Sequence, residues 1–508
     1  MSVSSRKQQI TALFDRFAAR QNPWTKRASA YYRYVVGLVR RLVPDPGRVL
    51  ELGSGSGDLL AALNPRHGVG VDLSSIMVDV AQQRHPDLEF RVGDAEGAEF
   101  DARFDVVLMV NLVGLLDDVY AALRTAHDAL DPRGRLVIVY YNHLWEPILR
   151  LASLLRLRAP IPHENWLPLS QVESLLRLTE FEVVRSGRRM LCPKFVPGVS
   201  WFLNTCIAPL PGFNALSLVE YVVARPLPRS GAACISKPGM PERSRHEPEP
   251  YGHGSRQAVP LREVGDGESL SCSIIIPTRD ERGNIEAAVD RTPDMGEHTE
   301  LIFVDGNSAD GTVEEIQRMI RERPERDIKF LSQGDGIGKG DAVRKGFELA
   351  TGDVLMILDS DLTMPPEDLP KYFEILASGR AEFVNGCRLV YPMEEEAMRF
   401  LNKIANHLFG KLFTWLIEQS VRDTLCGTKV LFRTDYDRIA ANRAFFGDFD
   451  PFGDFDLLFG AARLNLKIVD LPIRYRERTY GEIKIHRFRH GILLLRMSLF
   501  AARKLKFF

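Results

Sequence analysis

A run of five apolar residues that stops at two carboxylates constrains this chain more than any other stretch. The run covers residues 354–358, and Asp359, Ser360 and Asp361 follow it. An unbroken apolar run is typical of a strand buried on both faces of a parallel sheet, whose carboxyl end lies at the ligand-binding edge. Alternate strand residues share a side, so we expect both carboxylates to converge on one cation. Hard oxygen ligands favour Mg²⁺ or Mn²⁺.

The composition is that of an ordinary soluble globular protein with more than one domain. The chain has 508 residues, 45% of them apolar and 26% charged. A net charge of -1 gives no indication of nucleic acid as a partner. The six cysteines show no CxxC spacing, which predicts neither a disulfide framework nor a zinc site and favours a reducing compartment. The N-terminus carries early charges and no apolar core, so no signal peptide is expected.

A second strand-and-turn pattern lies near the N-terminus. An apolar strand at 48–52 runs into a glycine-rich turn and then an apolar helix. The glycines are Gly53, Gly55 and Gly57. The next strand ends at Asp72, where a carboxylate can bind both hydroxyls of a ribose. The spacing is GxGxG rather than the GxGxxG of dinucleotide sites, and Glu51 precedes it. An acid there would repel a pyrophosphate but suits an ammonium group, which favours S-adenosylmethionine.

Residues 30–225 resemble class I S-adenosylmethionine-dependent methyltransferases. Further matching segments are Gly93-Asp94-Ala95, Phe104 to Met109 and Leu130 to Ile138. The resemblance implies that Glu51 and the glycines hold the methionine end, that Asp94 meets the adenine amino group and that Asn111 lies beside the methyl donor. The cofactor-binding residues that it implies are Glu51, Gly53, Gly55, Gly57, Asp72, Asp94, Ala95 and Asn111.

Three neighbouring segments are given roles around this domain. Residues 1–46 are expected to be helical and packed on it. Residues 140–146 follow a predicted strand and are expected to shape the acceptor pocket, in which no base is named. Residues 195–219 carry no charge, but three prolines argue against a membrane span. We expect this segment to form a buried or membrane-grazing cap over the methyltransferase pocket.

Residues 226–270 are rich in proline and glycine and predict a linker. After them, strands ending in polar turns recur at 273–278, 301–305 and 328–331. Strands that alternate with helices imply a parallel sheet with its acids gathered at one edge. The predicted fold class is therefore α/β, with two doubly wound domains.

Residues 271–490 resemble family 2 glycosyltransferases of the GT-A fold, most closely polyprenyl-phosphate sugar transferases of the dolichyl-phosphate mannose synthase type. Further matching segments are 385–388, 423–429 and 478–484. The resemblance implies a metal-binding DxD element at Asp359 and Asp361. The nucleotide-sugar-binding residues that it implies are Pro277, Glu281, Asp305, Lys339, Asp359 and Ser360. The candidate catalytic residues are Asp361, Asp423, Arg388, Arg478 and Lys484, and the candidates for the acceptor phosphate are Arg388 and Arg399.

The chain departs from that family's pattern in two places. Asp305-Gly306-Asn307-Ser308 stands where Asp-Asp-Gly-Ser is common, which leaves the identity of the nucleotide base open. Thr278-Arg279-Asp280 replaces a common tyrosine-asparagine turn. The chain also has no QxxRW motif, which argues against a processive polysaccharide synthase.

The expected chemistry depends on the acceptor. A nucleotide-sugar leaves as a diphosphate, so a divalent ion held by the DxD carboxylates would neutralise developing charge. A polyprenyl phosphate is already an anion and requires no strong base. A hydroxyl acceptor would require one, and Asp423 is the candidate.

The C-terminus is basic and amphipathic, since Arg489, Arg496 and Arg503 share one side of a helix with apolar residues between them. Two alternatives remain open: a helix on an anionic membrane surface, or a helix packed on its own domain. The predicted location is cytoplasmic, with peripheral association at the inner face of the membrane.

The sequence predicts four segments: a methyltransferase domain at 1–225, a linker at 226–270, a GT-A domain at 271–487 and a basic helix at 488–508. The predicted function is bifunctional. It combines methyl transfer with metal-dependent glycosyl transfer from a nucleotide-sugar to a polyprenyl phosphate or glycan acceptor, in lipid-linked or surface glycan synthesis. The alternative is transfer to a soluble hydroxyl acceptor, with the first domain a non-catalytic scaffold that binds S-adenosylmethionine.

Overall fold

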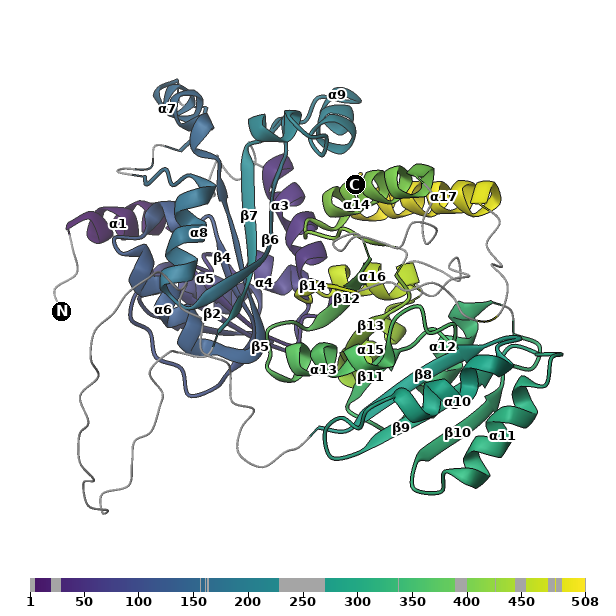
Figure 1. The fold of residues 1–508 in the computed structure, drawn as a ribbon. Helices are drawn as coiled ribbons and strands as arrows, with labels where there is room; N and C mark the ends of the chain where they lie inside the picture. Colours follow the sequence, from purple (N-terminus) through teal and green to yellow (C-terminus); the bar gives the residue numbers. More distant parts are fainter. Residues whose placement is uncertain are drawn as a thin grey trace, which may run out of the picture.

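A computed structural model of the chain describes residues 5–19, 29–155, 157–159, 161, 164–227, 270–336, 338–388, 400–424, 426–443, 454–473, 480 and 487–507. The described residues form two α/β units that lie side by side, each built on one seven-stranded sheet (Figure 1). Most strand pairs in both sheets are parallel, so the predicted fold class is confirmed.

The first sheet has the strand order β3-β2-β1-β4-β5-β7-β6. Its strands are β1 (Arg48–Leu52), β2 (His67–Asp72), β3 (Glu89–Val92), β4 (Phe104–Val110), β5 (Leu130–Tyr141), β6 (Phe181–Arg189) and β7 (Val219–Pro226). The first five are mutually parallel, and β7 runs antiparallel to both of its neighbours. Because the chain leaves β1 in both directions across the sheet, a crevice opens beyond the carboxyl ends of β1 and β4.

Helices cover both faces of this sheet. The longer ones are α1 (Ser5–Ala19), α3 (Ser29–Leu42), α4 (Asp58–Leu63), α5 (Ser75–Arg84), α6 (Val119–Ala129), α7 (Glu146–Leu154) and α8 (Leu169–Leu178). The short ones are α9 (Val199–Trp201), η1 (Val113–Leu115), η2 (His143–Trp145), η3 (Phe202–Ile207) and η4 (Phe213–Leu216). Leu50 and Leu52 face α6 and α8, whereas Val49 faces α3 and α4. This alternation explains why β1 has apolar residues on both of its faces.

The second sheet has the order β10-β9-β8-β11-β13-β12-β14. Its strands are β8 (Cys272–Thr278), β9 (Thr299–Asp305), β10 (Asp327–Ser332), β11 (Val354–Ile357), β12 (Phe383–Cys387), β13 (Lys429–Phe432) and β14 (Ile468–Pro472). β13 is antiparallel to β11 and β12, and the other pairs are parallel. The carboxyl ends of β8, β9 and β11 therefore lie at one edge, as predicted for the strands that end in acids.

One face of this sheet packs on α10 (Arg282–Arg291), α11 (Thr312–Glu322) and α13 (Leu369–Ala377), with η5 (Pro366–Asp368) before α13. The other packs on α12 (Lys339–Leu349), α14 (Phe400–Ile417), α15 (Arg433–Ala441), α16 (Asp454–Arg463) and α17 (Arg487–Leu505).

The C-terminal helix belongs to this core. Met497, Ala501 and Ala502 of α17 are buried in it, and α17 lies along α14 (Figure 1). Of the two alternatives for the C-terminus, packing on its own domain is therefore present, while Leu495 and Leu499 stay exposed. Within the part of the chain that the structure describes, no helix combines the length and apolar character needed to cross a bilayer.

Polar contacts join the two units directly. Arg135 on β5 donates from Nη2 to Glu382 Oε2 at 2.6 Å and from Nε to the carbonyl of Asn465 at 2.9 Å. The Asn465 side chain in turn donates to the carbonyl of Leu42, the last residue of α3, at 2.7 Å. Arg135 and Asn465 are both buried. Because buried polar groups are costly unless they are paired, these contacts fix how the two units sit together.

Candidate functional site

The glycine-rich turn after β1 forms an open cradle at the crevice of the first sheet. Gly53 donates to the carbonyl of Val71 at 2.7 Å, and Gly55 donates to Asp72 Oδ2 at 2.9 Å. Both glycines have positive φ, which side chains other than glycine's rarely adopt. A Cβ on Gly53 would meet the Leu112 side chain, whereas no described atom lies within 4 Å of a Cβ built on Gly55. The turn is thus packed behind Gly53 and open in front of Gly55.

Glu51 lies beneath this cradle and is 3% exposed. Burial raises its pKa to about 8, although a hydrogen bond from the Leu60 backbone opposes the shift. Among the described residues its Oε2 atom finds no hydrogen-bond partner. An orphaned carboxylate oxygen in a buried site fits a cationic ammonium group. Together with the open space at Gly55, it makes this edge of the sheet a fit for S-adenosylmethionine.

The N-terminal helix α1 covers the carboxyl edge of this sheet. Lys7 Nζ donates to Asp94 Oδ2 at 2.6 Å and to Glu96 Oε2 at 2.7 Å. Ser74 Oγ donates to Asp15 Oδ1 at 2.5 Å. Asp94, expected at the adenine, is therefore engaged by a lysine that the sequence did not single out. Ala95 beside it is buried.

Asn111 follows β4 with a φ of 55° and accepts a hydrogen bond from the Tyr31 hydroxyl of α3 at 2.6 Å. A small cavity adjoins it, whose lining includes Tyr140, Tyr141, Glu164 and Trp166. Tyr140 and Tyr141, from the segment expected to shape the acceptor pocket, line this cavity, and their role toward an acceptor stays a prediction. The packing of 1–46 on this domain is met by α1 and α3 in the described part of that range.

Arg158 contacts two residues that line this cavity, Glu164 and Tyr141. It donates to both carboxylate oxygens of Glu164, at 2.9 and 2.8 Å, and its guanidinium carbon lies 5.0 Å from the centre of the Tyr141 ring. Burial opposes its charge, but Glu164 raises its pKa overall. Neither residue was singled out from the sequence, because nothing near them in the chain marks a site.

In the second unit, the strand-ending acids of β8 and β9 gather at one edge. Asp305 accepts hydrogen bonds from the backbone and hydroxyl of Ser308, at 3.1 and 2.5 Å. Glu281 is buried and accepts from Asn284 at 2.8 Å. Pro277 lies half-buried near the end of β8. These three residues were expected to bind the nucleotide, and the structure places them at the same edge.

The two DxD carboxylates lie in a turn rather than on the strand. β11 ends at Ile357, and the Leu362 N–H donates to the carbonyl of Asp359 at 3.1 Å. The argument from strand alternation is therefore wrong, because Leu358 makes the last bond to β8, to the carbonyl of Ile275 at 3.0 Å, and the chain then turns, with Leu362 at a φ of 50°. Asp361 Oδ1 accepts from the Thr363 backbone and hydroxyl, at 3.2 and 2.8 Å.

Asp359 sits in a cationic environment. Lys339 Nζ lies 2.6 Å from its Oδ1 atom. Burial would raise the pKa of Asp359, but Lys339, Lys429 and Arg388 outweigh it and the pKa is lowered. A side chain at Gly427 would collide with both Asp359 and Lys339, so only glycine lets this segment approach them. Ser360 between the two acids is buried.

Asp423 is fully buried and paired with Arg388. The guanidinium donates to both carboxylate oxygens, at 2.7 and 2.9 Å, and the Arg388 backbone adds a third bond at 3.0 Å. Burial opposes ionisation, but Arg388 keeps the pKa of Asp423 below its usual value. A carboxylate held this way is a weak base. Of the remaining candidates, Arg399, Arg478 and Lys484 lie outside the described residues.

Within the described residues, no group of three or more His, Cys, Asp or Glu side chains is placed to hold a metal ion. Magnesium is commonly bound through one or two carboxylates together with substrate phosphates. Asp359 and Asp361, both accessible in part, provide such a donor set beside Lys339.

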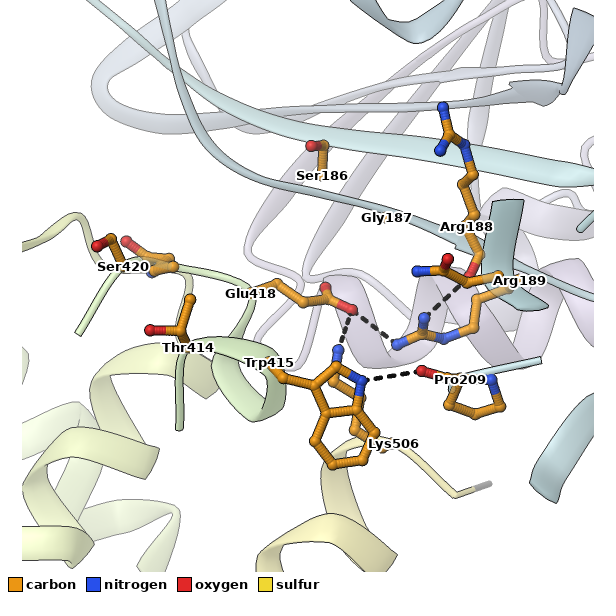
Figure 2. Close-up of a pocket in the computed structure, with 12 residues that line it drawn as sticks. Ser186, Gly187, Arg188, Arg189, Pro209, Thr414, Trp415, Glu418, Ser420 and Lys506 are labelled. Carbon is orange, nitrogen blue, oxygen red and sulfur yellow. Dashed lines mark hydrogen bonds and ion pairs between the residues drawn. The ribbon is translucent and has the colours of Figure 1, made fainter. Parts of the chain in front are cut away.

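A separate cavity of about 250 Å³ lies between the two units (Figure 2). Arg189 Nη2 donates to Glu418 Oε1 at 2.8 Å, and Lys506 and Tyr221 also bind the Glu418 carboxylate. Trp415 Nε1 donates to the carbonyl of Pro209 at 2.9 Å. This cavity contains none of the predicted site residues.

Comparison with known proteins agrees with two different domains. Residues 273–440 match the family model described as "Glycosyl transferase family 2", and residues 24–186 match "Methyltransferase domain". The dolichol-phosphate mannosyltransferase of Saccharomyces cerevisiae is 39% identical over 113 residues, 21% of this chain and 42% of that protein. The one from Pyrococcus furiosus is 28% identical over 223 residues, 42% of this chain and 59% of that protein.

The chain thus spans 42% and 59% of the length of these two curated relatives. Among solved structures, an S-adenosylmethionine-dependent methyltransferase from Thermotoga maritima has 20% sequence identity and a TM-score of 0.35, over 42% of this chain and 99% of that one.

Proposed function

The chain joins a methyltransferase domain to a family 2 glycosyltransferase domain, and we propose that it is a bifunctional enzyme. The second domain transfers a sugar from a nucleotide-sugar to a polyprenyl phosphate. The first transfers a methyl group from S-adenosylmethionine. Both steps serve the synthesis of a lipid-linked or surface glycan.

The ion pair between Asp423 and Arg388 is the observation that favours a phosphate acceptor over a hydroxyl acceptor. A hydroxyl acceptor needs a base to take its proton, and Asp423 was the candidate. The Arg388 pair holds this carboxylate ionised and fully buried, so it is poorly suited to accept a proton. A phosphate acceptor needs no base at all. The names of the matched relatives, which are dolichol-phosphate mannosyltransferases, support the same choice.

The glycosyltransferase residues divide into two groups. Pro277, Glu281 and Asp305 hold the nucleoside at the ends of β8 and β9. Asp359 and Asp361 would hold Mg²⁺ or Mn²⁺, which supplies positive charge to the leaving diphosphate.

Lys339 adds a second, fixed positive charge beside Asp359. Asp423 orients Arg388 through three hydrogen bonds. The roles of Arg388 and Arg399 toward the acceptor phosphate stay proposals of the same kind.

In the first domain, Glu51 and the Gly53–Gly57 turn hold the methionine end, and Asp72 holds the ribose. S-adenosylmethionine supplies an electrophilic methyl group on its sulfonium sulfur. Asn111 and Tyr31 form the wall next to the methyl donor, and Tyr141 and Trp166 lie beside it on the side from which the acceptor approaches. The enzyme works in the cytoplasm, bound peripherally to the inner face of the membrane.

The test uses the purified full chain with radiolabelled GDP- and UDP-sugars in detergent micelles. Three acceptors are compared: a polyprenyl phosphate, the matching polyprenol without its phosphate, and a soluble sugar. Label should enter the organic phase with the polyprenyl phosphate and not with the polyprenol. Transfer to the soluble sugar alone would overturn the proposed acceptor.

A further inference from the structure

Helix α7 turns an apolar stripe outward. Ile148, Leu151 and Leu155 recur at three- and four-residue spacing, which places them on one helix face. Each of the three is more than half exposed, and Leu154 beside them is 79% exposed. Over its full described length, α7 buries none of its side chains. A helix of this pattern normally packs its apolar stripe against a core. Here no other described element buries the stripe, so we expect another surface to contact it.

The charge-free segment at 195–219 also has exposed apolar side chains. Phe195 is 70% exposed and Trp201 63%, and Phe202 and Phe213 are at least half exposed. The expectation of a buried cap is therefore wrong for these side chains. The short helices α9, η3 and η4 leave these aromatic rings exposed, while the polar side chains of Ser200, Asn204 and Thr205 are buried. Exposed aromatic side chains grouped in this way mark an interaction surface.

Hydrogen bonds connect these parts and extend them into the second domain. Trp145, just before α7, donates from Nε1 to the carbonyl of Leu216 in η4 at 2.8 Å. Trp415 of α14 donates from Nε1 to the carbonyl of Pro209 at 2.9 Å (Figure 2). In Figure 1, α7 and α9 stand at the top of the first domain, and α14 and α17 run along the upper side of the second.

On those two helices, Leu408, Leu495 and Leu499 are each more than half exposed. We call the whole surface the apolar face. It comprises α7, residues 195–216 and the exposed sides of α14 and α17.

The charged residues of the segments that form the apolar face are mostly basic. Its single acidic residue in the sequence is Glu146, and this carboxylate pairs with Arg150 at 2.5 Å. The basic residues of these segments with described, exposed side chains are Arg150, Lys411, Arg496, Arg503 and Lys504. A protein interface has a polar rim of mixed character, whereas exposed aromatic and leucine side chains with a basic border fit an anionic bilayer.

We propose that the apolar face docks the chain on the surface of an anionic lipid bilayer, with the methyltransferase domain supplying most of the contact. The choice of a bilayer rests in part on the proposed function, because a polyprenyl phosphate resides there. From the sequence, the C-terminal helix was the first candidate for the membrane contact, and the segment at 195–219 was expected to be a buried or membrane-grazing cap. That helix buries much of one side in its own core and contributes only its exposed leucines and arginines.

The test measures binding of the full chain to sedimented vesicles, with no sugar or methyl transfer involved. One set of vesicles is phosphatidylcholine and the other contains phosphatidylglycerol as well. The wild type should bind the anionic vesicles more tightly. Trp201→Ser with Phe202→Ser, and separately Leu151→Ser with Leu155→Ser, should each lower the partition coefficient by about one to two orders of magnitude.

Leu178→Ser is the matched control. Leu178 is 69% exposed, so its side chain is as accessible as those of the apolar face. It lies just before the start of β6, where Phe181 pairs with Pro226, whereas the apolar face lies near the opposite end of β6, where Arg189 pairs with Val219. The control should bind like the wild type, and all variants should keep the wild-type thermal transition. Equal vesicle binding by the variants and the control, or no vesicle binding by the wild type, would overturn the docking surface. Sugar transfer in micelles is scored separately, so either idea can fail alone.

Discussion

Gly53 and Gly55 belong to one turn, yet their substitution should have different consequences. At Gly53 a side chain collides with Leu112, which perturbs packing. At Gly55 a side chain enters open space where the cofactor is expected. Gly55→Val should therefore leave a folded protein that no longer binds S-adenosylmethionine, as measured by titration calorimetry. Gly212→Val controls for backbone strain, because Gly212 also has positive φ and open space around its Cβ. Unchanged binding by a folded Gly55→Val protein would remove the cofactor assignment.

The raised pKa of Glu51 predicts that cofactor binding is coupled to the release of a proton. Its pKa rises from 4.5 to about 8 on folding, because the carboxyl is buried. Between these values the folded chain keeps a proton that the unfolded chain has lost. This contribution to stability is fully present below pH 4.5 and is lost as the pH rises through about 8. An ammonium ligand favours the ionised form, so binding near neutral pH should release about one proton.

Calorimetry in buffers of different ionisation enthalpy measures that release. Glu51→Gln should abolish it and weaken binding by about 1.5–3 kcal/mol. Proton release that persists in Glu51→Gln would assign the proton to another group. Asp72, whose pKa is also raised by burial, is the next candidate.

Individual site residues were predictable from the sequence where they lie at or near the end of a buried apolar strand. Glu51, Asp72 and Asp359 each stand at a point where apolar sequence meets a turn. Lys7 and Tyr31 were not predictable as site residues, because each reaches its partner across many residues of chain. A lysine and a tyrosine on amphipathic helices carry no local mark of such a contact.

At the scale of elements, the turn after β11 is the part most open to test. Asp361→Ala should lower divalent-dependent sugar transfer by about 10²-fold and leave methyl transfer intact, because the carboxylate would hold the ion at the diphosphate. Asp361→Asn keeps an oxygen for Thr363 and should lose nearly as much. The control is Asp353→Asn, at the opposite end of β11, where the carboxylate binds Ser271. Sugar transfer by the wild type that survives EDTA in full would contradict a metal role.

The central parallel strands were predictable from sequence, and the edge strands were not. β1, β4, β8 and β11 are buried on both faces, and most of the residues in each are apolar. β6 lies at the edge of its sheet, is half-buried and contains Ser186, Gly187 and three arginines. Its sequence therefore shows neither a continuous apolar run nor clean alternation.

At the scale of the molecule, Glu418 supports the junction between the domains. It is the shared partner of Arg189 and Lys506, both of which are nearly fully buried. Glu418→Gln leaves two buried cations without this countercharge and should destabilise the folded chain by about 3–5 kcal/mol. Glu322→Gln, which breaks an exposed pair with Arg318, should cost about 0–1 kcal/mol. Calorimetric unfolding measures both, and equal transition temperatures would show that the junction contributes little.

The existence of two domains was predictable, but their junction was not. Arg135 and Glu382 are far apart in the sequence, and each resembles an ordinary surface charge. Their pairing depends on how two finished folds meet, and no periodicity or motif in either half records that.

Helix α3 connects the methyltransferase site to the junction between the two domains. Tyr31 near its start donates to Asn111 in the proposed methyl-donor site, and the carbonyl of Leu42 at its end accepts a hydrogen bond from the Asn465 side chain of the other domain. The helix is about 20 Å long and is buried along one side. The length of α3 therefore sets the distance between Asn111 and the contact with Asn465, whatever the length of the connection at 228–269. A residue inserted in that connection should change nothing, whereas one inserted in α3 would rotate Tyr31 by about 100° away from Asn111.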